Sequence, residues 1–223
     1  MSDYETAVSI LDTELRGVEA VFRDLSPADW RTATLLTPFD EKARPWTVFE
    51  LAGHLDISIG LTRMLISSAQ EGQPGRDRVS FFIFARSEHA TTVYDYAYTM
   101  VEGKTPDQMP DVLHETFSKT VSESRATDPS TIGSGYYALM RLGEFVPSRI
   151  VEAVVHGFDL TDALGRPTIA TAEGVAVTAG ILDDLLARRT VAGRPADLAD
   201  DLSWVRAASG RTPHPDPRLP LIG

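Results

Sequence analysis

The stretch Arg149-Ile-Val-Glu-Ala-Val-Val-His-Gly-Phe-Asp159 places three polar side chains on an otherwise apolar segment. At about 100° per residue of α-helix, Glu152, His156 and Asp159 fall within about 60° of one another and form a single stripe. The other faces of this helix are apolar, so we expect the helix to be buried and its polar stripe to point inward. The polar stripe therefore requires an explanation.

A buried carboxylate without a partner costs several kcal/mol, so Glu152 requires a cation, either a metal ion or a nearby Arg. A second motif, Leu51-Ala-Gly-His-Leu-Asp56, lies nearly a hundred residues earlier and places His54 on the inward stripe of another predicted helix. Two His and one Glu are a ligand set of catalytic zinc sites, which leave one coordination position open. Spacing alone leaves a metal site and ordinary buried hydrogen bonds equally open. A mononuclear site fits better than a di-iron site, which needs two Glu-x-x-His pairs.

Around these two motifs the sequence predicts helices and almost no strands. Sequence signals for a helix start precede several of these helices. Examples are a capping box of Thr47 with Glu50, and an N-cap residue followed by Pro in Thr105-Pro-Asp-Gln108. The expected helical segments are 4–25, a short turn near Trp30, 47–71, 87–101, one opening at 105, one from near Pro147 to Gly165, 171–189 and 196–208. A Pro-rich tail follows.

Composition limits the classes of function. The chain has 223 residues, 43% of them hydrophobic, which suffices for a substantial core. A formal net charge of −11 disfavours nucleic acids and anionic lipid surfaces as partners. No signal peptide or membrane-spanning run is recognisable, so we expect a soluble, cytoplasmic protein. There is no Cys, so any thiol used in catalysis must arrive with a small molecule.

The two motifs together resemble those of the mycothiol-dependent maleylpyruvate isomerase family, a branch of the DinB-like metal-binding helix bundles. Supporting stretches are Trp46 before the His54 motif, Leu25–Trp30 and Trp204–Arg211, so the resemblance spans almost the whole chain. The family usually has Trp where this chain has Phe158, which keeps the aromatic character.

The resemblance implies an all-α, up-down four-helix bundle over residues 1–167 and a small helical C-terminal extension over 168–223. It also implies that His54, Glu152 and His156 bind a divalent metal, with zinc as the expected ion, and that mycothiol is the thiol cosubstrate. A metal with open positions would lower the pKa of that thiol. The thiolate would then isomerise a maleylpyruvate-like substrate by addition and elimination, or remain attached to an electrophile in an S-transferase.

Several cationic residues are candidates for the remaining roles. We expect Arg206 and Arg211 to act on a small, anionic electrophile and Arg149 to contact the cofactor, because guanidinium groups bind carboxylates in bidentate fashion. Arg149 could equally neutralise Asp159 or Glu144, and the other two could be solvated surface charges. Arg141 is a further candidate for such a clamp.

Asp159 is expected to accept a hydrogen bond from a ligand imidazole, although it could instead cap backbone N–H groups. His89, His114 and His214 have no partners at ligand spacing, so we interpret them as surface or core residues. The aromatic pairs Phe81-Phe82 and Tyr136-Tyr137 are expected in the core or in a pocket wall.

The sequence thus favours a metal-dependent, mycothiol-using transferase or isomerase, acting as a monomer or homodimer on a small molecule. Two alternatives stay open. One is a metal-binding bundle without catalytic activity, in which the ion only joins helices or a small ligand is sensed. The other is a hydrolase that uses metal-bound water at the same open position.

Overall fold

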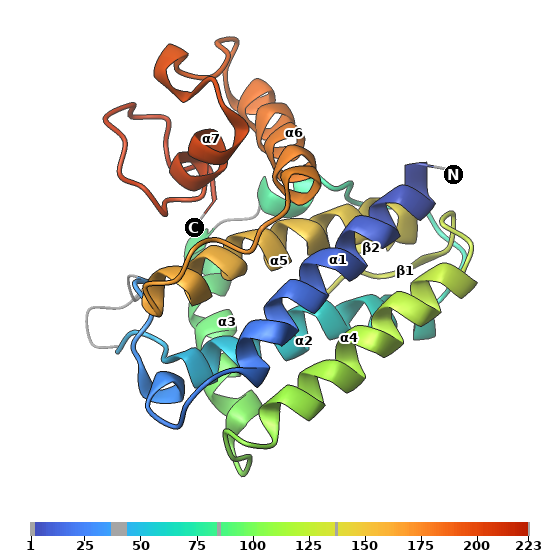
Figure 1. The fold of residues 1–223 in the computed structure, drawn as a ribbon. Helices are drawn as coiled ribbons and strands as arrows, with labels where there is room; N and C mark the ends of the chain where they lie inside the picture. The colour runs from blue at the N-terminus through green and yellow to red at the C-terminus, as the bar shows by residue number, and fades with distance from the viewer. Residues whose placement is uncertain (1–2, 37–43, 84–85, 137, 223) are drawn as a thin grey trace.

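A computed structural model describes residues 3–36, 44–83, 86–136 and 138–222 (Figure 1). The expected all-α class is confirmed, with one short hairpin in addition. The helices are α1 (Asp3–Arg23), α2 (Val48–Ser67), α3 (Arg86–Val101), α4 (Met109–Ala126), α5 (Leu142–Ala163), α6 (Ala172–Arg189) and α7 (Asp201–Ala208). Short 3-10 turns are η1 (Asp29–Arg31), η2 (Ser80–Ile83) and η3 (Ala196–Leu198), and the hairpin strands are β1 (Ile132–Ser134) and β2 (Leu139–Arg141).

Helices α1, α2, α4 and α5 form the bundle, and α3 lies across it against α2 (Figure 1). Residue numbers rise together along the contacts between α2 and α4, so these two helices are parallel. The pairs are Asp56 with Thr116, Ile59 with Thr120 and Arg63 with Glu123. Between α1 and α4 the numbers run in opposite directions, so these helices are antiparallel. The pairs are Tyr4 with Ser124, Glu19 with His114 and Arg23 with Asp111.

The directions therefore differ from the strict up-down alternation that we expected. Helix α1 runs one way, α2 and α4 run the other way, and α5 runs with α1. The reason is the long connection from α2 to α4, which contains α3 and returns the chain to the end where α2 began. As a result α5 lies antiparallel to α2 along their contact, with Arg149 near Ser58 and Glu152 near His54.

Helix α5 is largely buried, as the sequence predicted, but it begins five residues before Pro147. Its first two N–H groups, those of Leu142 and Gly143, donate to the carbonyls of Thr131 and Pro129. The hairpin region thus satisfies donors that a local cap would otherwise satisfy. At its other end Gly165 adopts a φ of +62° and closes a Schellman turn, as the predicted stop requires.

Two other boundaries differ from the predicted ones. Residues 105–108 form a turn in which the Thr105 N–H donates to Gln108 Oε1, so α4 starts at Met109 instead of at the cap signature. The predicted 196–208 helix is two elements, η3 and α7, because Asp200 caps the N–H of Ser203 and starts a new helix there. The capping box of Thr47 and Glu50 at the start of α2 is confirmed.

The C-terminal helices pack on the bundle through α5. Apolar side chains of α6 and α7, including Leu182, Leu185 and Trp204, belong to the same buried core as those of the bundle. Buried Glu14 of α1 accepts hydrogen bonds from the backbone and hydroxyl of Thr171, the N-cap of α6, and so ties α6 to the bundle. The division into domains at 167/168 stays a prediction.

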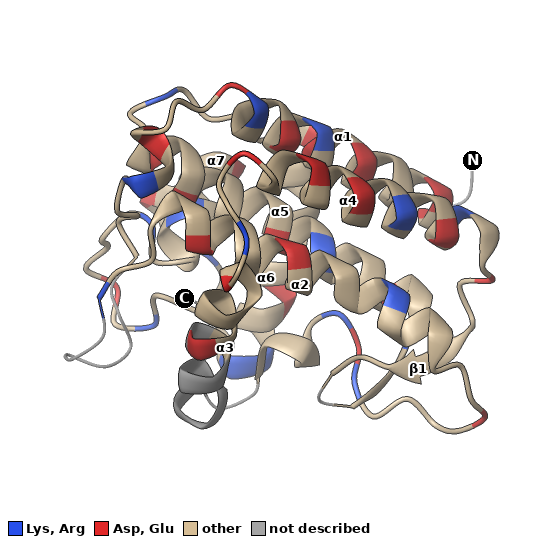
Figure 2. Ribbon diagram, turned by 90° about the horizontal axis from the view of Figure 1, so that it is seen from below, with Lys and Arg blue, Asp and Glu red and all other residues tan. Residues whose placement is uncertain are grey.

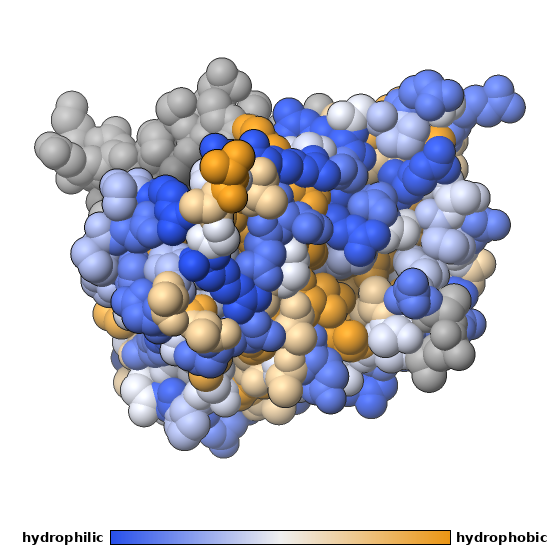
Figure 3. All heavy atoms as spheres, turned by 90° about the horizontal axis from the view of Figure 1, so that it is seen from above, coloured by the Kyte–Doolittle hydropathy of each residue, from blue (hydrophilic) through white to orange (hydrophobic). Residues whose placement is uncertain are grey.

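Charged residues are confined mainly to the outer faces of the helices, where both signs alternate along α1 and α4 (Figure 2). The face seen from above is largely hydrophilic, with apolar residues in a band across its middle (Figure 3). Among the described residues, no helix combines the length and the apolar character needed to cross a lipid bilayer.

The contact between α2 and α3 depends on Gly53, which directly precedes His54. A Cβ at residue 53 would lie 2.7 Å from Val101 Cγ1 and 3.0 Å from the Ala97 carbonyl oxygen, whereas one at Gly60 would meet only Thr116 Cγ2 at 3.5 Å. Both Gly→Ala changes favour the helix by about 1 kcal/mol. We expect G53A to be less stable than G60A by about 1–3 kcal/mol, the usual cost of overpacking.

Urea unfolding of the two variants and the parent measures this difference directly. Because both substitutions lie in α2, the gain in helix propensity cancels in the comparison. Equal stability of G53A and G60A would show that α3 does not pack closely on Gly53.

Candidate metal centre

Three side chains from two helices converge where α2 faces α5. His54 comes from the second turn of α2, and Glu152 and His156 lie one turn apart on α5. Glu152 Oε2 lies 3.4 Å from His54 Nε2 and 3.5 Å from His156 Nε2. The two imidazole rings meet edge to face with centroids 4.5 Å apart. The structure therefore brings together the predicted ligands of both motifs.

The donor set fits a divalent metal ion. Nitrogen and oxygen ligands about 2.1 Å from a tetrahedral ion lie roughly 3.4 Å from each other, which matches the two measured separations. All three ligand atoms lie within 4.8 Å of one another. One anionic and two neutral ligands suit zinc and other first-row divalent metals. A His₂Glu site leaves one tetrahedral position for a further ligand.

The orientation of His156 is fixed from behind by Asp159. His156 Nδ1 lies 2.7 Å from Asp159 Oδ2, and Arg211 binds the same carboxylate through Nε at 2.9 Å and through Nη2 at 2.7 Å. Burial raises the pKa of Asp159, but Arg211 and His156 outweigh it and lower this pKa to about 2. The ionised carboxylate only accepts hydrogen bonds, so Nδ1 is the donor and Nε2 faces Glu152. Asp159 thus contacts the imidazole of His156, and its role behind a metal ligand stays a prediction.

Glu152 has a second buried neighbour, Arg149. The guanidinium lies 3.8 Å from Glu152 Oε1, donates to the Ser58 carbonyl at 2.9 Å and contacts the Ser148 hydroxyl at 3.1 Å. It also lies over the rings of two phenylalanines, Phe81 and Phe145. Our alternative that Arg149 neutralises Asp159 or Glu144 is wrong, because those carboxylates pair with Arg211 and Arg78.

The surroundings set the charge of each ligand. Burial raises the pKa of Glu152, but Arg149 and the two imidazoles outweigh it and hold this pKa well below its usual range. Burial lowers the pKa of His54, and the neighbouring His156 lowers it further. Burial also lowers the pKa of His156, but hydrogen bonds to Asp159 and Glu152 leave this pKa above its ordinary value. The site therefore presents a carboxylate and a neutral His54 for metal binding.

The side chains of the three candidate ligands are slightly exposed to solvent. The side chains of His54, Glu152 and His156 are 9%, 17% and 13% exposed, whereas Arg149 is 1% exposed. Trp46, which is buried, covers His54 with a centroid distance of 5.0 Å. The three side chains therefore keep a small exposed fraction, whereas the guanidinium beside Glu152 is buried.

Two of the other predicted cations, Arg206 and Arg211, pair with carboxylates other than Glu152. Arg206 pairs with Asp162 and lies over the Phe158 ring, and Arg141 is exposed at the start of α5. Neither Arg206 nor Arg211 is a fully solvated surface charge, since their side chains are 24% and 9% exposed. Their predicted action on a substrate stays a prediction.

Two histidines outside the site contact carboxylates. His114 of α4 is exposed and lies beside Glu19 of α1, in agreement with the expected surface position. His214 contacts Asp197. The side chain of His89 and residue Tyr137 lie outside the described residues. Phe81 is buried against Phe145, in agreement with a core or wall position.

Sequence reasoning missed Phe145 and Ser58, which help to hold Arg149. Phe145 lies one helical turn before Arg149, but our predicted start near Pro147 left it outside the helix. Ser58 lies one turn after His54 on the same face of α2, and its backbone carbonyl, not its side chain, receives the guanidinium. Periodicity could have identified the first residue, whereas no sequence signal marks a backbone acceptor.

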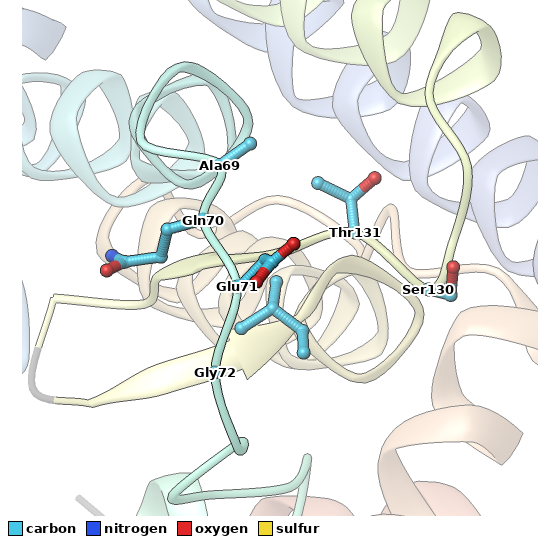
Figure 4. Close-up of a pocket in the computed structure, with 7 residues that line it drawn as sticks. Ala69, Gln70, Glu71, Gly72, Ser130 and Thr131 are labelled. Atoms are coloured by element: carbon cyan, nitrogen blue, oxygen red, sulfur yellow. The ribbon is translucent and has the colours of Figure 1, made fainter.

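A cavity of about 440 Å³ lies elsewhere, past the C-terminal end of α2 (Figure 4). Its lining consists of Ala69, Gln70, Glu71, Gly72, Ser130, Thr131 and Ile132. It lies some fifteen residues beyond His54, which corresponds to roughly 22 Å along a helix axis. Glu71 is the one titratable group in its lining, so this cavity offers little chemistry and is separate from the metal centre.

Searches of protein-family models, of curated proteins and of solved structures found no match to this chain.

Loss of one ligand from either motif should strongly weaken metal binding. We expect H54A and E152Q each to weaken Zn²⁺ binding by more than the 10–100-fold typical of losing a residue behind the ligands. Competition with a chromogenic chelator measures the affinity. The control is H114A, which removes an exposed imidazole on α4. Unchanged affinity in H54A, or an equal loss in H114A, would rule out this site.

Zinc affinity should also fall as the solution becomes more acidic. Because the pKa of His156 is raised, this imidazole holds a proton to a higher pH than usual, and the metal must displace it. The pKa of His54 is lowered, so this ligand is already neutral. Between about pH 8 and about pH 5 we expect the affinity to drop progressively as His156 becomes protonated. Constant affinity over this range, after correction for the chelator, would contradict this ligand assignment.

Proposed function

We propose that this protein is a metal-dependent enzyme that activates a low-molecular-weight thiol, mycothiol. The thiolate either becomes attached through its sulfur to a small electrophile or isomerises the electrophile by addition and elimination. The observation that carries the proposal is the His54, Glu152 and His156 set, spaced for one ion and partly exposed. A site with three protein ligands leaves a position for a reacting group, whereas a purely structural zinc site has four.

The charges around the site favour an anionic fourth ligand. Glu152 lies beside Arg149, and Asp159 is paired with Arg211, so each carboxylate has its own guanidinium. The four side chains together carry no net charge, and the positive charge of a bound divalent ion would stay uncompensated. A thiolate satisfies that charge better than a neutral thiol.

A divalent ion held by these ligands would lower the pKa of a thiol at its open position and so supply a nucleophile at neutral pH. The residues of the chain prepare the position. Asp159 holds His156 with Nδ1 as donor, Arg149 holds Glu152 ionised, and Trp46 shields the His54 ring from water. Because the protein has no Cys, the sulfur must come from a small molecule.

The resemblance of the two motifs to mycothiol-dependent maleylpyruvate isomerases supports mycothiol as this thiol. Isomerisation and S-transfer place the same demand on the metal centre and differ in the second substrate. Water as the fourth ligand would make the protein a hydrolase, and the experiment below separates these two functions.

Calorimetric titration of mycothiol into the zinc-loaded protein tests the proposal. We expect binding that disappears when the metal is removed and that releases about one proton per thiol, because a free thiol of pKa about 8.5 is protonated at neutral pH. Titrations in buffers of different ionisation enthalpy count that proton.

S-methyl mycothiol is the matched ligand control, since it keeps the sugar and lacks the ionisable sulfur. H54A is the protein control and should not bind mycothiol through its sulfur. Equal binding of mycothiol and its S-methyl derivative, or mycothiol binding that does not depend on metal, would overturn thiol activation.

A further inference from the structure

The metal centre is connected to the C-terminal part of the chain by charged hydrogen bonds. Arg211 lies three residues beyond α7, and its guanidinium donates two hydrogen bonds to the carboxylate of Asp159 in α5. Asp159 in turn holds the imidazole of His156. Arg211 and Asp159 are 9% and 4% exposed, so water competes little for these contacts.

The end of α7 is built to direct Arg211 toward Asp159. Gly210 has a φ of +77°, and the N–H of Arg211 donates to the Arg206 carbonyl at 2.7 Å, which closes a Schellman turn. A third hydrogen bond, from Arg211 Nη1 to the Ser209 carbonyl, fixes the guanidinium against its own backbone. The contact with its own backbone therefore orients the Arg211 side chain toward Asp159.

We infer that Arg211 is a positioning residue for the metal centre and that metal binding and docking of residues 206–222 stabilise each other. A metal ion on Nε2 needs His156 with its proton on Nδ1, and Arg211 holds the Asp159 carboxylate in the orientation that accepts a hydrogen bond from this N–H. If docking strengthens metal binding, the metal must strengthen docking by the same factor. The inference rests on the metal centre and does not depend on the choice of thiol.

Arg194 provides a matched control in the same part of the chain. Its guanidinium pairs with Asp183 of α6 and Asp201 of α7 and lies over the Trp204 ring, so it secures α7 without touching Asp159. Loss of Arg194 should loosen the C-terminal segment in general. Loss of Arg211 should change the metal centre specifically.

The first measurement is zinc affinity, without any thiol present. We expect R211M to weaken Zn²⁺ binding about 10–100-fold, the range for residues that orient a ligand, and R194M to leave it unchanged. D159N should weaken it at least as much, and the double variant R211M/D159N should be no weaker than D159N alone, because both residues act on the same imidazole. R211K, which keeps the charge without the planar fork, should fall between the parent and R211M.

The visible absorption spectrum of the Co²⁺-substituted protein reports ligand geometry directly. It should change in R211M and not in R194M. Hydrogen exchange tests the reciprocal effect: Zn²⁺ should slow exchange of the Arg211, Thr212 and Leu221 amides in the parent protein. In R211M this protection should be lost, while Zn²⁺ still protects α5.

Each outcome has a defined meaning. Equal zinc affinity in R211M and the parent, or equal weakening by R211M and R194M, would overturn the inference. So would exchange of the parent's C-terminal amides that does not respond to Zn²⁺, a result that requires no variant to fold. If the protein binds zinc with this coupling but does not bind mycothiol, the thiol proposal fails and the positioning role of Arg211 stands.

Discussion

The charge of Glu152 on the most buried helix is the constraint on which the site depends. Alone in an apolar core, this carboxylate would cost several kcal/mol. Arg149 stands beside it, and both imidazoles face it from two helices. The guanidinium is buried in turn, so Ser58, Ser148 and two aromatic rings surround it. The carboxylate of Glu152 thus requires partners from both α2 and α5, and its guanidinium partner requires further contacts of its own.

The two carboxylates of the site have different tasks because their partners differ. Glu152 faces two imidazoles and is partly exposed, whereas Asp159 is enclosed between Arg211 and His156. Glu152 is placed to bind an ion, and Asp159 is placed to fix the orientation of the His156 imidazole. Asp159 lies three residues after His156, so one surface of a single helix carries both roles.

Local patterns predicted the features that local forces create. The capping box at Thr47, the Schellman stop at Gly165 and the inward stripe on α5 depend on residues within one or two turns, and the structure has all three. The start of α5 could not be predicted in this way, because carbonyls of Thr131 and Pro129 receive its first N–H groups. The parallel course of α2 and α4 follows from a long connection whose path no periodicity encodes. The partner of Arg211 was missed for the same reason, since the contact closes across 52 residues.

The separations along the chain have a consequence during synthesis. His54 meets Glu152 across 98 residues, and Arg211 meets Asp159 across 52 residues. A nascent chain that has been synthesised to residue 200 contains the three candidate metal ligands but lacks Arg211. The contribution of Arg211 to the orientation of His156 can therefore begin only after residue 211 has left the ribosome.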